Sequence, residues 1–230
     1  MRKIYLSVNA YHLDVYCKIL RYWGLYLFVI CCFTCEIQAQ QRTFESVCGK
    51  EKSVIIWDKK KRNNIIILNT TQNSEVHHYR FSPSLTTLSW QVVNPTKYTD
   101  LTITLYNSNY YLNGTFNNQP YSKIVKSKGH PWHQNIAYSA GELLANKKSF
   151  KYECFRPDNL ELYIMQAERE SIPASFNAQD TYEVKVRLTG VLSHFWSCLY
   201  YFSTENHQFI GYKGVNGGPG TPETIIKSSR

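Results

Sequence analysis

Apolar and polar positions alternate with a period of two over several short segments of the chain. Residues 101–105 read Leu-Thr-Ile-Thr-Leu, and residues 88–92 repeat the pattern with larger apolar side chains. Val184, Val186 and Leu188 alternate with charged or polar residues in the same way. Successive side chains of a β-strand point to opposite faces, so this alternation predicts strands with one buried face.

Two continuous apolar runs flank a charged segment. Residues 54–57 and 65–68 consist of Val, Ile, Leu and Trp, as is typical of fully buried strands. Residues 58–64 between them read Asp-Lys-Lys-Lys-Arg-Asn-Asn, which predicts a charged hairpin loop. The basic run has a second interpretation as an anion-binding patch, but a solvated turn that keeps two apolar strands apart is favoured.

Further strand-like segments complete an all-β pattern. They lie at residues 76–81, 109–116, 150–155, 160–164 and 194–202. The chain then holds nine or ten short strands, separated by turn segments such as residues 107–109 and 117–120. Short strands joined by such turns predict an antiparallel β-sandwich or a barrel, and we expect the sandwich.

Helical signals are confined to two segments. Residues 139–142 have the Ser-x-x-Glu spacing of a capping box, so we expect one or two helical turns at residues 139–147. Residues 158–168 admit a helix that opens at Asp158, but positions 160–164 alternate as a strand does, and we choose the strand.

The N-terminal segment predicts export. Residues 22–35 are uncharged and follow several basic residues, and Ile37-Gln38-Ala39 supplies a cleavage site. A signal peptide needs an apolar run of about 7–15 residues, whereas a transmembrane helix needs about 20. We therefore predict a signal peptide at residues 1–39; an uncleaved signal anchor remains the alternative. Either way, the rest of the chain enters the secretory pathway.

The expected folded domain spans residues 40–203. After Phe202 the strand pattern fades, and residues 214–220 read Gly-Val-Asn-Gly-Gly-Pro-Gly. We expect a flexible tail over residues 204–230. No second apolar segment long enough to span a membrane follows, so we expect no C-terminal membrane anchor in this chain.

Composition excludes some classes of protein. Hydrophobic residues make up 43% of the chain and aromatic residues 15%, too many for a disordered segment. The net charge is +9, and +7 remains without residues 1–39, which hold four of the 26 basic and two of the 17 acidic residues. A basic balance is typical of nucleic-acid partners, but an exported chain does not meet them. Anionic glycans or membrane surfaces remain as partners.

Three cysteines follow the predicted leader. An odd number in an oxidising compartment implies one disulfide and one remaining thiol. We predict the pair Cys154–Cys198, because each of these residues follows an aromatic, strand-like run. The pairings of Cys48 with Cys154 or with Cys198 stay open.

Two sequons predict N-glycosylation. Asn69-Thr70-Thr71 and Asn113-Gly114-Thr115 are acceptor sequences, so we expect Asn69 and Asn113 to be exposed and glycosylated.

The sequence carries no catalytic signature that we recognise. His77 and His78 are adjacent and would point to opposite faces of a strand, and His130 and His133 lack a defined third ligand, whereas zinc needs three or four. A nucleophile elbow and the common metal motifs are missing. We therefore expect no catalytic residues, no cofactor, no metal and no enzyme activity.

The order of motifs from residue 85 to 203 resembles a known family. The matching pieces are Leu88-Ser89-Trp90, residues 101–105, Tyr110-Tyr111, Phe150-Lys151-Tyr152-Glu153-Cys154 and residues 197–202. Their order is similar to that of the luminal domain shared by lysosome-associated membrane proteins and the accessory subunit S1 of the V-type proton ATPase.

The resemblance implies a β-prism-like luminal domain and a non-catalytic role in the assembly or regulation of an organelle-acidifying pump. Its partners would be proton-pump membrane subunits. The location would be the lumen of the endosome or lysosome, or the extracellular space. The alternative from the residues themselves is a secreted β-sandwich binding module for a small apolar ligand or an anionic glycan.

Overall fold

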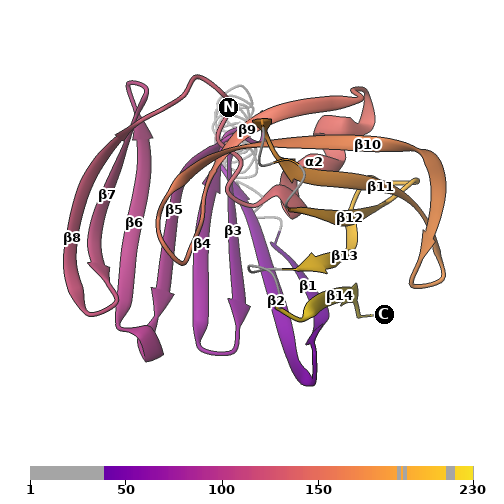
Figure 1. Ribbon diagram of the computed structural model, residues 1–230, viewed down its shortest axis with the longest axis horizontal. Helices are drawn as coiled ribbons and strands as arrows, with labels where there is room; N and C mark the ends of the chain where they lie inside the picture. Colours follow the sequence, from indigo (N-terminus) through magenta and orange to yellow (C-terminus); the bar gives the residue numbers. More distant parts are fainter. Residues whose placement is uncertain (1–38, 191–192, 194–195, 216–220, 230) are drawn as a thin grey trace, which may run out of the picture. The chain divides into compact units, whose positions relative to one another are not determined.

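The computed structural model describes residues 39–190, 193, 196–215 and 221–229. They form fourteen strands, one α-helix, α2 (Ile136–Ala145), and a 3-10 turn, η1 (Pro95–Lys97). The strands are β1 (Ala39–Cys48), β2 (Glu51–Arg62), β3 (Ile65–Gln72), β4 (Glu75–Phe81), β5 (Thr87–Asn94), β6 (Thr99–Tyr106), β7 (Asn109–Phe116), β8 (Gln119–Lys126), β9 (Ser149–Phe155), β10 (Leu162–Phe176), β11 (Gln179–Leu188), β12 (Ser197–Ser203), β13 (Phe209–Val215) and β14 (Glu223–Ser228) (Figure 1).

All fourteen strands belong to one antiparallel sheet. Its order is β8-β7-β6-β5-β4-β3-β2-β1-β14-β13-β12-β11-β10-β9. Two meanders, β1–β8 and β9–β14, are therefore joined where β1 pairs with β14, from Phe44 opposite Ser228 to Cys48 opposite Thr224. The all-β antiparallel prediction is confirmed. The predicted sandwich of two sheets is wrong, because the β1–β14 ladder makes the sheet continuous.

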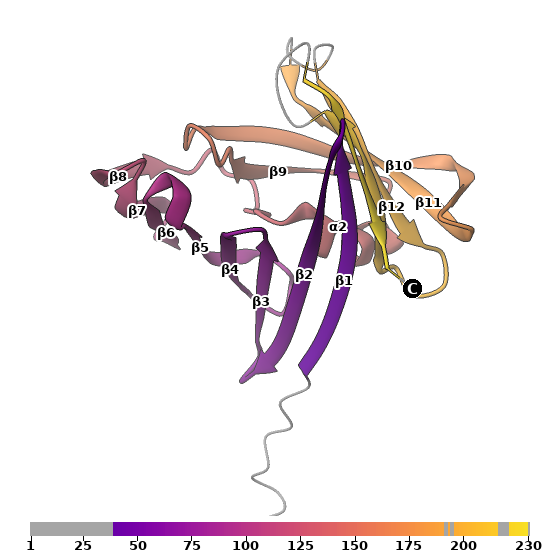
Figure 2. The same cartoon turned by 90° about the horizontal axis from the view of Figure 1, so that it is seen from below.

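The sheet is not closed, and β8 and β9 are its edges. The segment before α2 connects the two meanders. Trp132 forms a parallel bridge with Glu153 of β9, and its carbonyl accepts a 2.8 Å hydrogen bond from the backbone N–H of Thr87 in β5. Figure 2 shows β9–β12 passing over the face of the first meander, with α2 between the two.

Helix α2 fills the space between the meanders. Its Tyr138 ring lies 6.4 Å from Trp57 of β2 and 4.9 Å from Phe81 of β4. On the other side, the hydroxyl of Tyr182 in β11 donates a 3.0 Å hydrogen bond to the carbonyl of Gly141. The helix therefore packs against both meanders.

The ends of α2 differ from the prediction. Asn135, rather than Ser139, caps the N-terminus by accepting a 3.1 Å hydrogen bond from the N–H of Tyr138. Ser139 lies inside the helix and is buried. At the other end, Arg169 of β10 donates two 3.4 Å hydrogen bonds to the last carbonyls of the helix.

Asparagine-rich hairpin turns set the strand lengths. Both residues of Asn63-Asn64, Asn107-Ser108, Asn117-Asn118 and Asn177-Ala178 have positive φ, as two-residue type I′ turns require. The turns at residues 107–108 and 117–118 lie within the predicted turn segments. The charged loop predicted at residues 58–64 is wrong: β2 continues to Arg62, because Asn63-Asn64 suffices to reverse the chain.

Two local irregularities expose or move residues that the alternation pattern predicts to face the core. The β4–β5 register shifts between Arg80 and Phe81, so Thr87 is buried while Leu88 is 37% exposed. This is a β-bulge, which a strict two-residue alternation does not reveal. Leu160 lies in a turn at φ 57° and not in a strand. The strand predicted there begins at Leu162, and its inward residues are Met165 and Ala167.

The predicted flexible tail is in part a central piece of the sheet. Strands β13 and β14 come from residues 204–230 and lie between β12 and β1. Phe209, Ile210 and Tyr212 are buried, and this apolar burial holds the segment in the sheet. The prediction of a tail is therefore wrong for these two strands.

Some predicted features lie outside the described residues. They are the signal peptide, apart from Ala39, and the first two residues of the strand predicted at 194–202. Within the described part of the chain, no helix is both long enough and apolar enough to cross a membrane.

Candidate functional site

A cavity of about 530 Å³ lies between the inner face of the sheet and α2. We call it the main cavity. Its walls come from β1, β2 and β3, from the turn at residues 83–85, from α2 and from residues 206–209. Its larger apolar and aromatic lining residues include Trp57, Leu68, Leu85, Tyr138, Leu143 and Phe209. Binding pockets for small molecules commonly enclose about 300–1,000 Å³, so this one is large enough for a ligand.

Strand register explains why these side chains share one cavity. Arg42 of β1 pairs with Trp57 of β2, and Gln40 pairs with Lys59. Lys59 in turn pairs with Leu68 of β3. Paired residues point to the same face of a sheet, so all five side chains face α2.

Aromatic rings form the inner wall of the main cavity. Trp57 stacks on Phe209 of β13 with the ring centroids 5.5 Å apart and the planes 13° apart. Phe44 lies 4.9 Å from Trp57 and 5.2 Å from Phe209. These rings bring together β1, β2 and β13, which are distant in sequence.

A second, smaller cavity of about 150 Å³ lies beyond this wall. We call it the inner cavity. It shares Trp57, Ala137 and Phe209 with the main cavity, and its remaining lining comes from Phe44, Ile55, Tyr200, Tyr212 and Ile226. Its lining is almost entirely apolar, whereas the main cavity combines apolar with polar residues.

Two cationic side chains, Arg42 of β1 and Lys59 of β2, line the main cavity, and we call this part of it the polar end. The Nη2 of Arg42 donates a 2.7 Å hydrogen bond to the carbonyl of Phe209, and its guanidinium lies 5.0 Å from the centre of the Phe44 ring. Partial burial lowers the pKa of Arg42 from its usual value. The Nζ of Lys59 lies 5.7 Å from the centre of the Tyr138 ring.

One histidine supports the rim of the main cavity. Nδ1 of the buried His133 lies 3.0 Å from the carbonyl oxygen of Leu85 and donates a hydrogen bond to it. Burial lowers the pKa of His133 to about 4, so its ring is neutral near pH 7. Leu85 has a positive φ of 62°, and the bond to His133 holds this unusual backbone in place.

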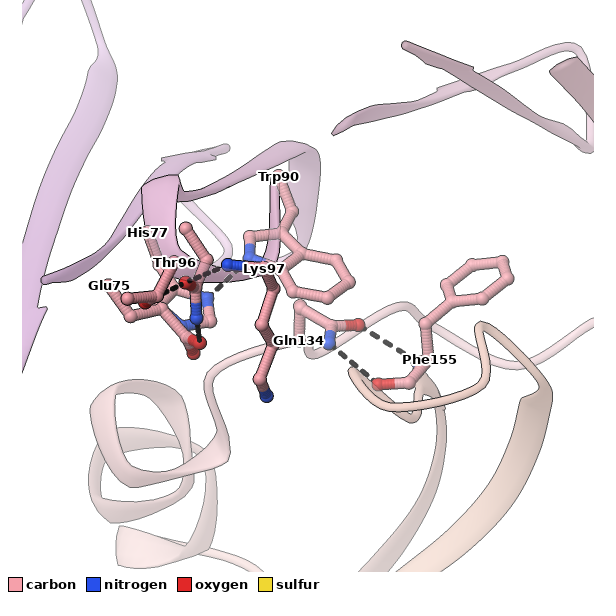
Figure 3. A network of polar contacts seen from close by, with 8 residues as sticks. Glu75, His77, Trp90, Thr96, Lys97, Gln134 and Phe155 are labelled. Atoms are coloured by element: carbon pink, nitrogen blue, oxygen red, sulfur yellow. Dashed lines mark hydrogen bonds and ion pairs between the residues drawn. The ribbon is translucent and has the colours of Figure 1, made fainter. Parts of the chain in front are cut away.

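A polar network lies elsewhere, on β4 and β5 (Figure 3). Trp90 Nε1 lies 3.0 Å from His77 Nδ1, and His77 Nε2 lies 2.7 Å from Glu75 Oε1. An indole N–H only donates, so Nδ1 of His77 accepts and Nε2 donates to the carboxylate. This hydrogen bond is the main reason that the pKa of Glu75 falls to about 2, with a further contribution from Asn94 against the opposing effect of burial.

The network has the Glu–His pairing of a catalytic base but not its free nitrogen. Trp90 and Glu75 occupy both ring nitrogens of His77. The ring therefore has no free nitrogen with which to take a proton from a substrate. The arrangement orders the ends of β4 and β5 instead.

The predicted disulfide is absent from the structure, where Cys48, Cys154 and Cys198 are all free thiols. Cys154 lies on β9 and Cys198 on β12, and β10 and β11 stand between these strands in the sheet order. Burial raises the pKa of each of these two thiols to about 12.

The predicted glycosylation residues lie on strands. Asn113 on β7 is exposed, and its Oδ1 accepts a 2.9 Å hydrogen bond from Ser122. Asn69 on β3 is half-buried, and its Oδ1 lies 2.8 Å from Nδ1 of His78. Neither asparagine lies in the main cavity, and their glycosylation remains a prediction.

Comparisons with known proteins bear on the fold. No family model and no curated protein matches the chain. Among solved structures, a beta-barrel-like protein of the domain of unknown function DUF1849 from Brucella abortus matches with a TM-score of 0.51 and 9% identity, over 84% of this chain and 96% of that one. A LolA superfamily protein from Nitrosomonas europaea matches with a TM-score of 0.26 and 6% identity, over 85% and 86%. The first likeness shows a similar fold, and the second is too low to support an argument.

Proposed function

We propose that this chain is a non-catalytic binding module of the secretory pathway that holds a small amphipathic molecule in the main cavity. The carrying observation is a space of about 530 Å³ walled by Trp57, Leu68, Tyr138, Leu143 and Phe209. Apolar walls with a few polar groups at one end are typical of sites that bind small molecules.

Of the two functions expected from sequence, the cavity favours the binding module. The role in a proton-pump assembly rests on the motif resemblance, and no feature of the main cavity adds to it. A purely polar glycan also fits less well, because the inner wall and the inner cavity are aromatic and aliphatic.

The test is displacement of a fluorescent apolar probe, N-phenyl-1-naphthylamine, from the full-length protein by dodecanol. We expect Leu143→Trp to weaken binding at least about tenfold, because the larger ring would project into the main cavity from α2. Leu88→Trp places the same ring on an exposed position of β5 and should leave binding unchanged. Equal binding by both variants, or no binding by the wild type, would contradict the proposal.

A further inference from the structure

Two positively charged side chains, Arg42 and Lys59, lie at the polar end of the main cavity. Arg42 and Lys59 lie on neighbouring strands and face the same way, because Arg42 pairs with Trp57 and Lys59 follows Trp57 by two residues. Such diagonal neighbours have Cα atoms roughly 7–8 Å apart. Two cationic side chains from neighbouring strands therefore line the same part of the main cavity.

Within the part of the chain that the structure describes, these two cations have no acidic ion-pair partner. Among the described residues, no carboxylate lies within ion-pair distance of Arg42 or Lys59. The carboxylate in the cavity lining is Glu142, an exposed residue of α2. Lys61, two residues beyond Lys59 on the same face, adds a third positive charge, and Tyr138 and His207 are the remaining titratable groups of the lining.

Partial burial of the Arg42 guanidinium favours the binding of an anion beside it. Burial lowers the pKa of Arg42, since the guanidinium loses part of its hydration. The one acceptor for it among the residues that the structure describes is the neutral carbonyl of Phe209, whereas a guanidinium has five N–H donors. A carboxylate or phosphate matches the donor geometry of arginine and forms shorter, stronger hydrogen bonds than a neutral acceptor.

We infer that Arg42 and Lys59 form an anion-binding site at the polar end of the main cavity, which selects amphiphiles with an anionic head group. This inference rests on the proposed function and specifies its ligand class. The aliphatic tail lies against Trp57, Leu68 and Phe209, and the head group lies between the two cations. Carboxylate and phosphate head groups share this chemistry.

The test compares ligands that have the same tail but different heads. Dodecanoate, dodecyl phosphate, dodecanol and dodecylamine are titrated into the full-length protein at low and high salt. We expect the two anions to bind about tenfold more tightly than dodecanol, and dodecylamine more weakly, with the preference reduced by salt. The ratio of dodecanoate to dodecyl phosphate identifies the preferred head group.

Substitutions test whether Lys59 and Arg42 cause the preference for an anionic head group. Lys59→Gln and Arg42→Gln should each lower the affinity for dodecanoate several-fold and leave that for dodecanol unchanged. Lys60→Gln removes the same charge from the opposite face of β2, where Lys60 pairs with Asp58 at 3.1 Å, and should retain the full preference. Arg42→Lys keeps the charge and reports on binding if Arg42→Gln does not fold.

Three results would overturn the inference. The wild type would bind dodecanol as tightly as dodecanoate, Lys60→Gln would lose as much preference as Lys59→Gln, or neither ligand would bind. In the first two cases the proposed function survives with a different ligand class. In the third case the proposed function fails as well.

Discussion

At the scale of single residues, His133 makes stability depend on pH. Burial lowers its pKa in the folded protein from 6.5 to about 4, whereas the unfolded chain takes up a proton near pH 6.5. The unfolded state therefore binds more protons between these values. The stability contributed by neutral His133 is present above pH 6.5 and is lost as the pH falls to about 4, by about 3 kcal/mol in total. Urea unfolding at pH 7 and at pH 5 measures the part of this loss that occurs above pH 5, about 2 kcal/mol.

His133→Asn is the matched variant, because the amide can still donate to Leu85 but does not titrate near pH 6. Its stability should change less between pH 7 and pH 5 than that of the wild type. Glu75 does not interfere, because its pKa is lowered from 4.5 to about 2 and its contribution is lost below pH 4.5. Parallel pH profiles for the two proteins would show that His133 is not the group responsible.

At the scale of elements, Gly141 determines how closely α2 approaches the turn between β12 and β13. A Cβ atom at this position would lie 1.9 Å from the carbonyl oxygen of His207 and 2.8 Å from the Phe202 ring. Gly141→Ala should lower the free energy of unfolding by about 1–3 kcal/mol, although alanine favours a helix by about 1 kcal/mol. Thermal unfolding beside Glu142→Ala, an exposed neighbour, tests this, and a stabilised Gly141→Ala variant would contradict the packing described.

Elements also show what sequence patterns can predict. Strand β6 was predictable, because its apolar residues Leu101 and Ile103 are the buried ones. Leu88 was not, because the bulge that exposes it depends on the partner strand. The charges on residues 59–62 predict a loop at the end of β2. The strand nevertheless continues to Arg62, because the two-residue turn Asn63-Asn64 is enough to reverse the chain.

The candidate site was harder to predict than the strands. Arg42, Trp57 and Phe209 meet because β1 pairs with β14 and the two meanders join, a contact between distant parts of the chain that local periodicity does not encode. Lys59 lay in the segment interpreted as a loop. A usable signal was present: Trp57 and Lys59 alternate in β2 as residues of one face do.

At the scale of the whole molecule, Glu153 connects the two ends of the sheet. This fully buried carboxylate on β9 accepts hydrogen bonds from the hydroxyl of Tyr110 on β7 at 2.8 Å, from Ser127 at 3.1 Å and from the N–H of His130 at 2.8 Å. Glu153→Ala should lower the free energy of unfolding by about 3 kcal/mol or more, because it leaves the buried Tyr110 hydroxyl and two part-buried donors without this acceptor.

Chemical denaturation measures the free energy of unfolding of Glu153→Ala beside that of two control variants. Tyr110→Phe removes one of the three bonds and should cost about 1 kcal/mol. Glu161→Ala removes an exposed carboxylate that accepts from the hydroxyl of Tyr163 and should change stability little. If Glu153→Ala were as stable as Glu161→Ala, the ends of the sheet would be held by other contacts.

The central claim is that an anionic amphiphile occupies the main cavity, and photolabelling tests it most directly. Full-length protein is irradiated with dodecanoate that carries a diazirine in its tail, and the labelled residues are mapped by peptide mass spectrometry. We predict labels on Trp57, Tyr138 or Leu143, suppressed by an excess of unlabelled dodecanoate. Labels confined to the exposed apolar residues Leu88 and Ile124, or labelling that excess dodecanoate does not suppress, would contradict the claim.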